Sequence, residues 1–82
     1  MKQLLKFSAS WCGPCKTLTE IMKGVDFKDV ELKQIDIDDN LTEARKYNIR
    51  GVPTVVLLEN DVEIGRKIGV MSESEIEEFI HG

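Results

Sequence analysis

The two cysteines of this chain, Cys12 and Cys15, are separated by only two residues. A disulfide across so short a loop restricts the unfolded chain very little, which argues against a purely structural cross-link. A zinc site would need two further ligands, and the single histidine, His81, cannot supply both. Closely spaced thiols that alternate between dithiol and disulfide are typical of redox sites. We therefore predict a redox-active pair, with a metal site or two packing cysteines as the alternatives.

The residues on either side of the pair predict that a strand and a helix position it. Residues 2–7 have the composition of a short strand. Gly13 and Pro14 follow the first cysteine, and proline at the first helical positions loses no hydrogen bond. Gly24 is expected to end the helix. Its apolar face is predicted by the i, i+3, i+4, i+7 spacing of Leu18, Ile21, Met22 and Val25.

This placement matters for the chemistry of the thiols. Cys12 falls at the N-terminus of the predicted helix, where unpaired N–H groups and the helix dipole favour a thiolate. Cys15 lies one turn inside the helix and is expected to be better shielded. A reactive first thiol and a resolving second thiol follow from these positions.

Downstream patterning predicts the rest of the fold. We expect a strand over 30–37 that contacts core on both faces, a short helix opened by a capping box of Asn40 and Glu43, a central strand over 54–58, a turn at 60–61 and an edge strand over 62–68. Ser72 and Glu75 predict a second capping box, which opens a final helix. The order β-α-β-α-β-β-α predicts an α/β fold with a four-stranded mixed sheet and helices on both faces.

Composition excludes several classes of protein. The 82 residues carry a net charge of −4, with 41% hydrophobic and 32% charged residues, as in ordinary globular domains. An acidic chain is a poor match for nucleic acid, because phosphate binding needs a basic surface. No apolar run approaches the ~20 residues of a membrane helix, and residues 1–7 do not resemble a secretory signal. We expect a single domain over residues 1–82, acting as a cytoplasmic monomer without a membrane partner.

A second motif completes a family resemblance. Gly51-Val52-Pro53-Thr54 precedes the predicted central strand, about 40 residues after Trp11-Cys12-Gly13-Pro14-Cys15. Together with the element order, the two motifs resemble the thioredoxin family over nearly the whole chain. The resemblance implies a minimal thioredoxin fold that begins at the strand before the cysteine motif, as in glutaredoxins and glutaredoxin-like thioredoxins.

The resemblance also implies roles for the residues of the first motif. Cys12 corresponds to the nucleophile that attacks a target disulfide, and Cys15 to the thiol that resolves the mixed disulfide. Trp11 corresponds to an aromatic lid beside the thiols, with a core position as the alternative. Gly13 and Pro14 are expected to position the pair.

The second motif carries the implied binding residues. Pro53 corresponds to a cis-proline that faces the disulfide, with an ordinary proline at a strand start as the alternative. Val52 corresponds to the residue whose backbone pairs with an extended substrate segment. Gly51 and Gly69 are expected to leave room for that segment, with relief of a strand end as the alternative for Gly69.

Lys6 is the sharpest departure from the family. At this position thioredoxins usually carry a buried aspartate that is assigned to proton transfer with the resolving cysteine. Gln34 stands where a lysine often partners that aspartate. One interpretation is that Lys6 extends its ammonium to the surface and is chemically idle. The other is that a partly buried Lys6 has a lowered pKa and either stabilises a thiolate or relays a proton to Cys15.

These residues predict a protein-disulfide reductase that works by dithiol exchange on disulfide-containing target proteins. The chain has no Gly-rich dinucleotide fingerprint, so we expect that it cannot take hydride from a nicotinamide itself and receives electrons from a thioredoxin-reductase-like enzyme or from glutathione. We expect no cofactor or metal beyond the Cys12–Cys15 disulfide. One alternative is a glutaredoxin-like enzyme, for which Lys16 and Arg50 are the only nearby basic candidates. Another is a non-catalytic redox sensor or a subunit of a larger enzyme.

Overall fold

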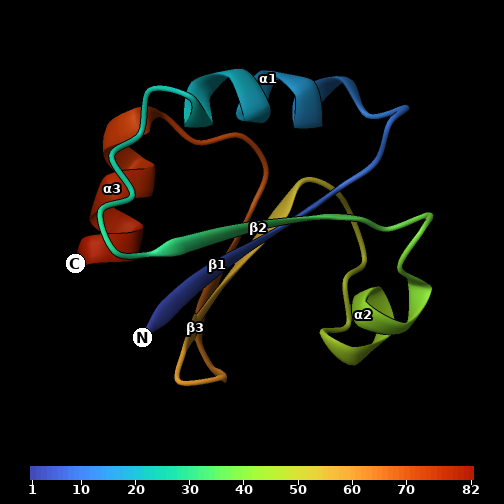
Figure 1. Cartoon of the computed structure of the whole chain (residues 1–82). Helices are drawn as coiled ribbons and strands as arrows, with labels where there is room; N and C mark the ends of the chain where they lie inside the picture. The colour runs from blue at the N-terminus through green and yellow to red at the C-terminus, as the bar shows by residue number, and fades with distance from the viewer.

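Four strands and three helices follow one another in the predicted order (Figure 1). The computed structural model describes all residues from 1 to 82. The elements are β1 (Lys2–Ser8), α1 (Gly13–Met22), β2 (Glu31–Asp36), α2 (Leu41–Lys46), β3 (Thr54–Glu59), β4 (Val62–Ile68) and α3 (Glu73–His81). The sheet order is β2-β1-β3-β4, with β1 parallel to β2 and antiparallel to β3, and β3 antiparallel to β4. This confirms the predicted mixed α/β sheet.

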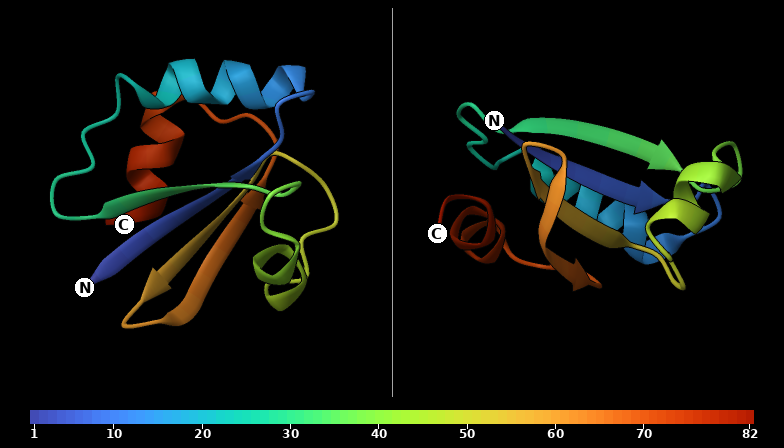
Figure 2. Two further views of the ribbon diagram at one scale, coloured as in Figure 1. Left: turned by 45° about the vertical axis from the view of Figure 1, so that its right-hand side comes forward. Right: turned by 90° about the horizontal axis from the view of Figure 1, so that it is seen from below.

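Alternation along the strands divides the core between the two faces of the sheet. Figure 2 shows α1 and α3 on one face and α2 on the other, which confirms helices on both faces. The larger apolar cluster lies under α1 and α3 and contains Leu4, Leu18, Met22, Val25, Val30, Val55, Leu57, Met71, Ile76 and Ile80. The smaller cluster, on the face of α2, contains Leu5, Phe7, Ile35, Val56 and Leu58. In β1, therefore, Leu4 and Lys6 point toward α1, whereas Leu5 and Phe7 point away from it.

The ends of α1 and α3 match the predictions from local sequence. Cys12 is the N-cap of α1, and Lys23 is its C-cap, directly before Gly24. Ser72 and Glu75 form the predicted capping box of α3, with each side chain bonded to the backbone N–H of the other residue. The N–H of Ser72 lowers the pKa of the Glu75 carboxyl below its ordinary value, because it stabilises the carboxylate.

The predicted capping box at α2 is wrong. Asn40 is the N-cap residue, but its side chain makes no capping hydrogen bond to the helix. Instead its amide donates to the carbonyl of Asp36, at 3.0 Å. Asparagine can bond to nearby carbonyls as well as to helical N–H groups, and the tight connection from β2 brings the Asp36 carbonyl within reach.

The two edge strands are more exposed than the central pair. β2 was expected to contact core on both faces, and it does so through Leu32 and Ile35, but most of its other residues face solvent because it is an edge strand. The hairpin into β4 turns at Asn60 and Asp61, whose φ angles of 51° and 69° are those that a tight two-residue hairpin requires. β4 confirms the predicted edge strand and leaves Val62, Ile64 and Ile68 exposed.

Arg66 ties β4 to the segment that follows α2. Its guanidinium donates to the Tyr47 carbonyl at 2.8 Å and makes two hydrogen bonds to the Glu63 carboxylate. These bonds lower the pKa of Glu63 below its ordinary value. All three helices lack the length and the apolar character that a span of the lipid bilayer requires.

Candidate active site

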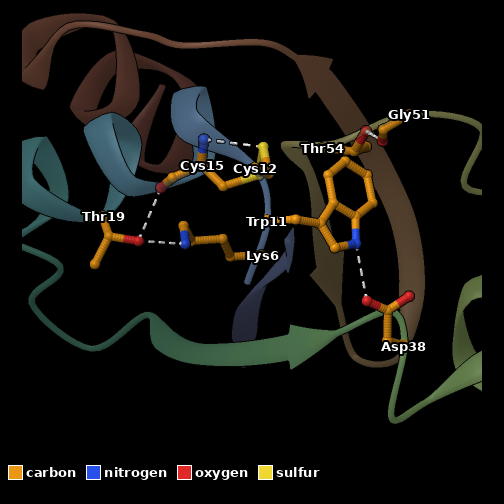
Figure 3. Close-up of a disulfide and its surroundings, with 8 residues drawn as sticks. All are labelled: Lys6, Trp11, Cys12, Cys15, Thr19, Asp38, Gly51 and Thr54. Carbon is orange, nitrogen blue, oxygen red and sulfur yellow. Dashed lines mark hydrogen bonds between the residues drawn. A yellow bond between two sulfur atoms is a disulfide. The ribbon is translucent and has the colours of Figure 1, made fainter. Parts of the chain in front are cut away.

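Cys12 and Cys15 form a disulfide at the start of α1 (Figure 3). Both residues are buried, with exposed fractions of 5% and 2%. The backbone N–H of Cys15 donates to the sulfur of Cys12 at 3.1 Å, as expected of an N-cap side chain. An N–H that donates to sulfur stabilises a thiolate more than a thiol, as does the positive end of the helix dipole. The first turn of α1 therefore provides the electrostatic setting of a reactive thiol at Cys12.

Trp11 lies beside the disulfide and is exposed, with 67% of its surface accessible, so the alternative of a core tryptophan is wrong. Its indole N–H donates to the carboxylate of Asp38 at 2.9 Å (Figure 3). The backbone N–H of Asp38 in turn donates to the Asp36 side chain. Asp38 follows the end of β2, so its hydrogen bond fixes the orientation of the exposed Trp11 ring relative to the edge of the sheet. The sequence alone did not single out Asp38 for this contact.

We expect the substitution Asp38→Ala to free the Trp11 ring without unfolding the chain, because both residues are exposed. Loss of one hydrogen bond, worth about 1 kcal/mol, predicts a decrease of about fivefold in kcat/KM for a protein disulfide. Tryptophan fluorescence anisotropy should fall at the same time. Asp39→Ala, at the adjacent exposed position, is the control. Unchanged anisotropy and kcat/KM in Asp38→Ala would show that this bond does not hold the ring in solution.

The second motif lies next to the disulfide, as predicted. The Val52–Pro53 peptide bond is cis, which confirms the expected cis-proline, and β3 begins at the next residue. Val52 is partly buried against the small cluster formed by Ala9, Cys12 and Cys15. The segment is held from both sides, since Thr54 donates its hydroxyl to the Gly51 carbonyl at 2.7 Å and the Gly69 N–H donates to the Pro53 carbonyl at 2.9 Å.

The three glycines near the site leave open space around their Cα atoms. A Cβ atom on Gly13, Gly51 or Gly69 would meet no other atom within 4 Å. Gly69 directly follows β4 and has a φ of +95°, which favours glycine and supports its predicted role at a strand end. Nothing within the chain requires a glycine at position 51, where an added side chain would only obstruct an approaching backbone. The role of Gly51 and Gly69 in substrate binding stays a prediction.

Lys6 is buried and does not extend its ammonium into bulk solvent, so the interpretation of an idle surface lysine is wrong. Its side chain is 1% exposed, because its position in β1 points it beneath α1. Its ammonium donates to the Thr19 hydroxyl at 2.6 Å, and that hydroxyl donates to the carbonyl of Cys15 at 2.9 Å (Figure 3). Burial lowers the pKa of Lys6 below its ordinary value, since water no longer stabilises the charge. Sequence reasoning did not identify Thr19, although it lies one helical turn after Cys15 and so shares its face.

Together these features define a class of protein. A disulfide at the N-terminus of a helix, a neighbouring cis-proline and a mixed sheet with helices on both faces characterise thiol–disulfide oxidoreductases. The family model described as Thioredoxin matches residues 1–82, and the chain belongs to the thioredoxin family.

Relatives from distant organisms agree with this assignment. The thioredoxin of Mycoplasma genitalium is 43% identical over 75 residues, which cover 89% of this chain and 74% of the relative. A thioredoxin of Buchnera aphidicola is 38% identical over 82 residues, which cover 95% of this chain and 74% of the relative.

Solved structures show the same fold. A mutant thioredoxin from Halobacterium salinarum superposes with a TM-score of 0.90 at 32% identity, covering 98% of this chain and 72% of that one. Thioredoxin-2 of the malaria parasite protein secretion machinery superposes with a TM-score of 0.92 at 28% identity, covering 99% and 82%. The chain is therefore a thiol–disulfide oxidoreductase of the protein-disulfide reductase type, and the glutathione-linked and non-catalytic alternatives are not favoured.

Proposed function

We propose that the chain reduces disulfides in target proteins by a two-step exchange in which Cys12 is the nucleophile and Cys15 the resolving thiol. The Cys12 thiolate attacks one sulfur of the target, forms a mixed disulfide and displaces the other target sulfur as a thiolate. The Cys15 thiolate then attacks the Cys12 sulfur, releases the second target thiolate and restores the Cys12–Cys15 disulfide. The observation that carries this assignment is the N-cap position of Cys12, whose sulfur accepts the Cys15 N–H.

The target segment binds, in this proposal, across the surface next to the disulfide. The backbone of Val52 pairs with an extended segment, while Pro53 keeps the adjacent chain in place. Gly51 and Gly69 leave space for that backbone, and the exposed ring of Trp11 covers it from the other side. Binding through backbone groups and a small apolar surface suits targets of varied sequence.

Gly13 and Pro14 contribute by positioning rather than by contact with the reacting sulfur. They form the first turn of α1, and proline there keeps the N-terminal turn in helical geometry. The Cys15 N–H that donates to the Cys12 sulfur is thereby held in place before the reaction begins.

We further propose that the disulfide is the only redox group and that no cofactor or metal takes part. Electrons come from an external thioredoxin-reductase-like enzyme, with glutathione as the second candidate. A transient, catalytic disulfide is typical of a compartment that keeps other thiols reduced, which supports action in the cytoplasm. We also propose that the chain acts as a monomer. Gel filtration of the reduced chain at micromolar concentration tests the oligomeric state.

The experiment that tests the function is the reduction of an interchain protein disulfide, such as that of insulin, by excess dithiothreitol. Catalytic amounts of the chain should accelerate precipitation of the released chains in proportion to concentration. Replacing dithiothreitol with NADPH and a thioredoxin reductase, or with glutathione and its reductase, then identifies the electron source. No acceleration with dithiothreitol would contradict the proposed function.

A further inference from the structure

Lys6 is a buried lysine without an acidic partner. It is the only charged residue among the buried residues of the chain, and its one hydrogen-bond partner in the protein is the neutral hydroxyl of Thr19. The ion pairs of the structure join Lys23 to Glu20 and Arg66 to Glu63, and neither involves Lys6. A buried charge without a partner is costly, so such a group is expected to respond strongly to any negative charge that arises nearby.

The redox pair is where a negative charge arises. One hydroxyl group, that of Thr19, is hydrogen-bonded both to the Lys6 ammonium and to the Cys15 carbonyl, which places the ammonium directly beneath the first turns of α1 (Figure 3). The Thr19 proton is directed at a backbone oxygen and not at sulfur. The geometry therefore favours an effect of the charge itself over a proton relay through Thr19 to Cys15.

A shallow pocket connects Lys6 with solvent. Its volume of about 150 Å³ is lined by Lys6, Thr19, Met22, Lys23, Leu32 and Gln34. A space of this size and partly polar lining admits several water molecules, which lets Lys6 exchange protons with the solvent.

Few other charges face Lys6. From α1, the charged neighbour in the pocket is Lys23, which is exposed and paired with Glu20 at 2.7 Å. From β2, the residues facing Lys6 are the neutral Leu32 and Gln34, and from β3 the register neighbour is Val55. Cys12 and Cys15 are the remaining titratable groups nearby, and they acquire charge only when the disulfide is reduced.

We propose that Lys6 is a positioning residue that acts through its charge: its ammonium is the counter-charge of the thiolate formed on reduction, and its protonation is linked to the redox state of the pair. This role presupposes the dithiol exchange proposed above. When an external dithiol supplies two electrons, the S–S bond breaks and yields one thiolate and, with one proton from solvent, one thiol. Where Lys6 is neutral in the oxidised protein, its amine takes a second proton through the pocket and becomes the ammonium. Reoxidation by a target disulfide returns both protons.

The direction of the pH dependence follows from this linkage. The thiolate favours the ammonium, so the pKa of Lys6 is higher in the reduced protein than in the oxidised protein, where burial lowers it. Below both values, Lys6 is charged in both states and makes the pair easier to reduce. Above both values it is neutral and this effect is lost. At a pH between the two pKa values of Lys6, reduction of the disulfide takes up a second proton, which binds to the Lys6 amine.

The variant Lys6→Met tests the role, since methionine is apolar and similar in length and removes the buried charge together with its hydrogen bond to Thr19. Two charges within about 10 Å at an effective dielectric constant of about 20 change an equilibrium constant about tenfold. We therefore expect the equilibrium constant for reduction by glutathione at pH 7 to fall about tenfold, equivalent to a potential about 30 mV more reducing. The pKa of the Cys12 thiol, followed by thiolate absorbance, should rise by about one unit. Lys23→Met, at the exposed lysine of the same pocket, should change either quantity less than twofold.

The difference in potential between wild type and Lys6→Met should disappear as the pH rises through the two pKa values of Lys6. A difference of less than twofold in the equilibrium constant across the whole pH range would overturn the role of Lys6. If Lys6→Met does not fold, the pH dependence of the wild-type reduction potential tests the role by itself. A slope at alkaline pH that shows no second proton taken up on reduction would also overturn the role of Lys6. Insulin reduction by wild type and by Lys6→Met separates the role of Lys6 from the exchange mechanism. Retained activity of Lys6→Met with an unchanged potential rejects only the role of Lys6. An inactive wild type rejects the exchange mechanism.

Discussion

Replacing Cys12 with serine is expected to abolish catalysed reduction of protein disulfides, with a loss of at least about 10³-fold in rate. Serine has nearly the same size, so the N-cap bond of α1 can persist while the nucleophile is lost. The insulin assay with dithiothreitol measures the effect directly. Thr17→Ala, at an exposed position on the same helix, is the matched control and should retain full activity.

Cys15→Ser should fail in a different way. The first step remains possible, so a mixed disulfide between Cys12 and the target should accumulate instead of being resolved. Mass spectrometry of the chain after incubation with oxidised target should show this adduct, and Cys12→Ser should show none. If Cys12→Ser kept its activity, or if the adduct formed at Cys15 instead, the assigned roles of the two thiols would be wrong.

The substitution Phe7→Ala is expected to have the largest effect on stability, about 3–5 kcal/mol. Phe7 is fully buried in the smaller cluster, and its ring lies 5.8 Å from that of Tyr47. This face of the sheet is covered by one short helix, so few neighbours can move in to fill the cavity. A chain of 82 residues has a free energy of unfolding of roughly 4–12 kcal/mol, and the variant is expected to lose much of it.

Equilibrium unfolding in urea, followed by circular dichroism, measures this loss. Ile68→Ala is the matched control, because Ile68 also lies in a strand but is 75% exposed, and its loss should be below about 0.5 kcal/mol. A loss below about 1 kcal/mol in Phe7→Ala would mean that the smaller cluster is not a packed core in solution.

Most of the elements could be predicted from the sequence because their signals are local. The capping box of Ser72 and Glu75 and the turn at 60–61 involve residues within one turn of chain, and the structure contains both. Leu18 and Met22 of the predicted apolar stripe pack on the sheet, whereas Val25 is buried in the same cluster but lies beyond the end of α1. Local signals fail where a second local partner competes, as at Asn40, whose amide bonds to the carbonyl of Asp36 four residues earlier instead of capping its helix.

The site divides in the same way. The pairing of Cys12 with Cys15 and the position of Cys12 at a helix start are properties of adjacent residues, so the sequence by itself determined the redox chemistry. The cis-proline at position 53 was expected only through the family resemblance, and its place beside the thiols depends on the pairing of β1 with β3.

Only the tertiary structure decided the environment of the thiols. The contact of Trp11 with Asp38 and the burial of Lys6 against Thr19 join residues from different elements. A lysine can reach the surface from many positions in a strand, so the sequence left both interpretations of Lys6 open. The alternation of β1 instead put this side chain on the face that α1 covers, and packing of α1 on that face decided that it is buried. Spacing along the chain thus determined which groups react, and packing between elements determined the charges that surround them.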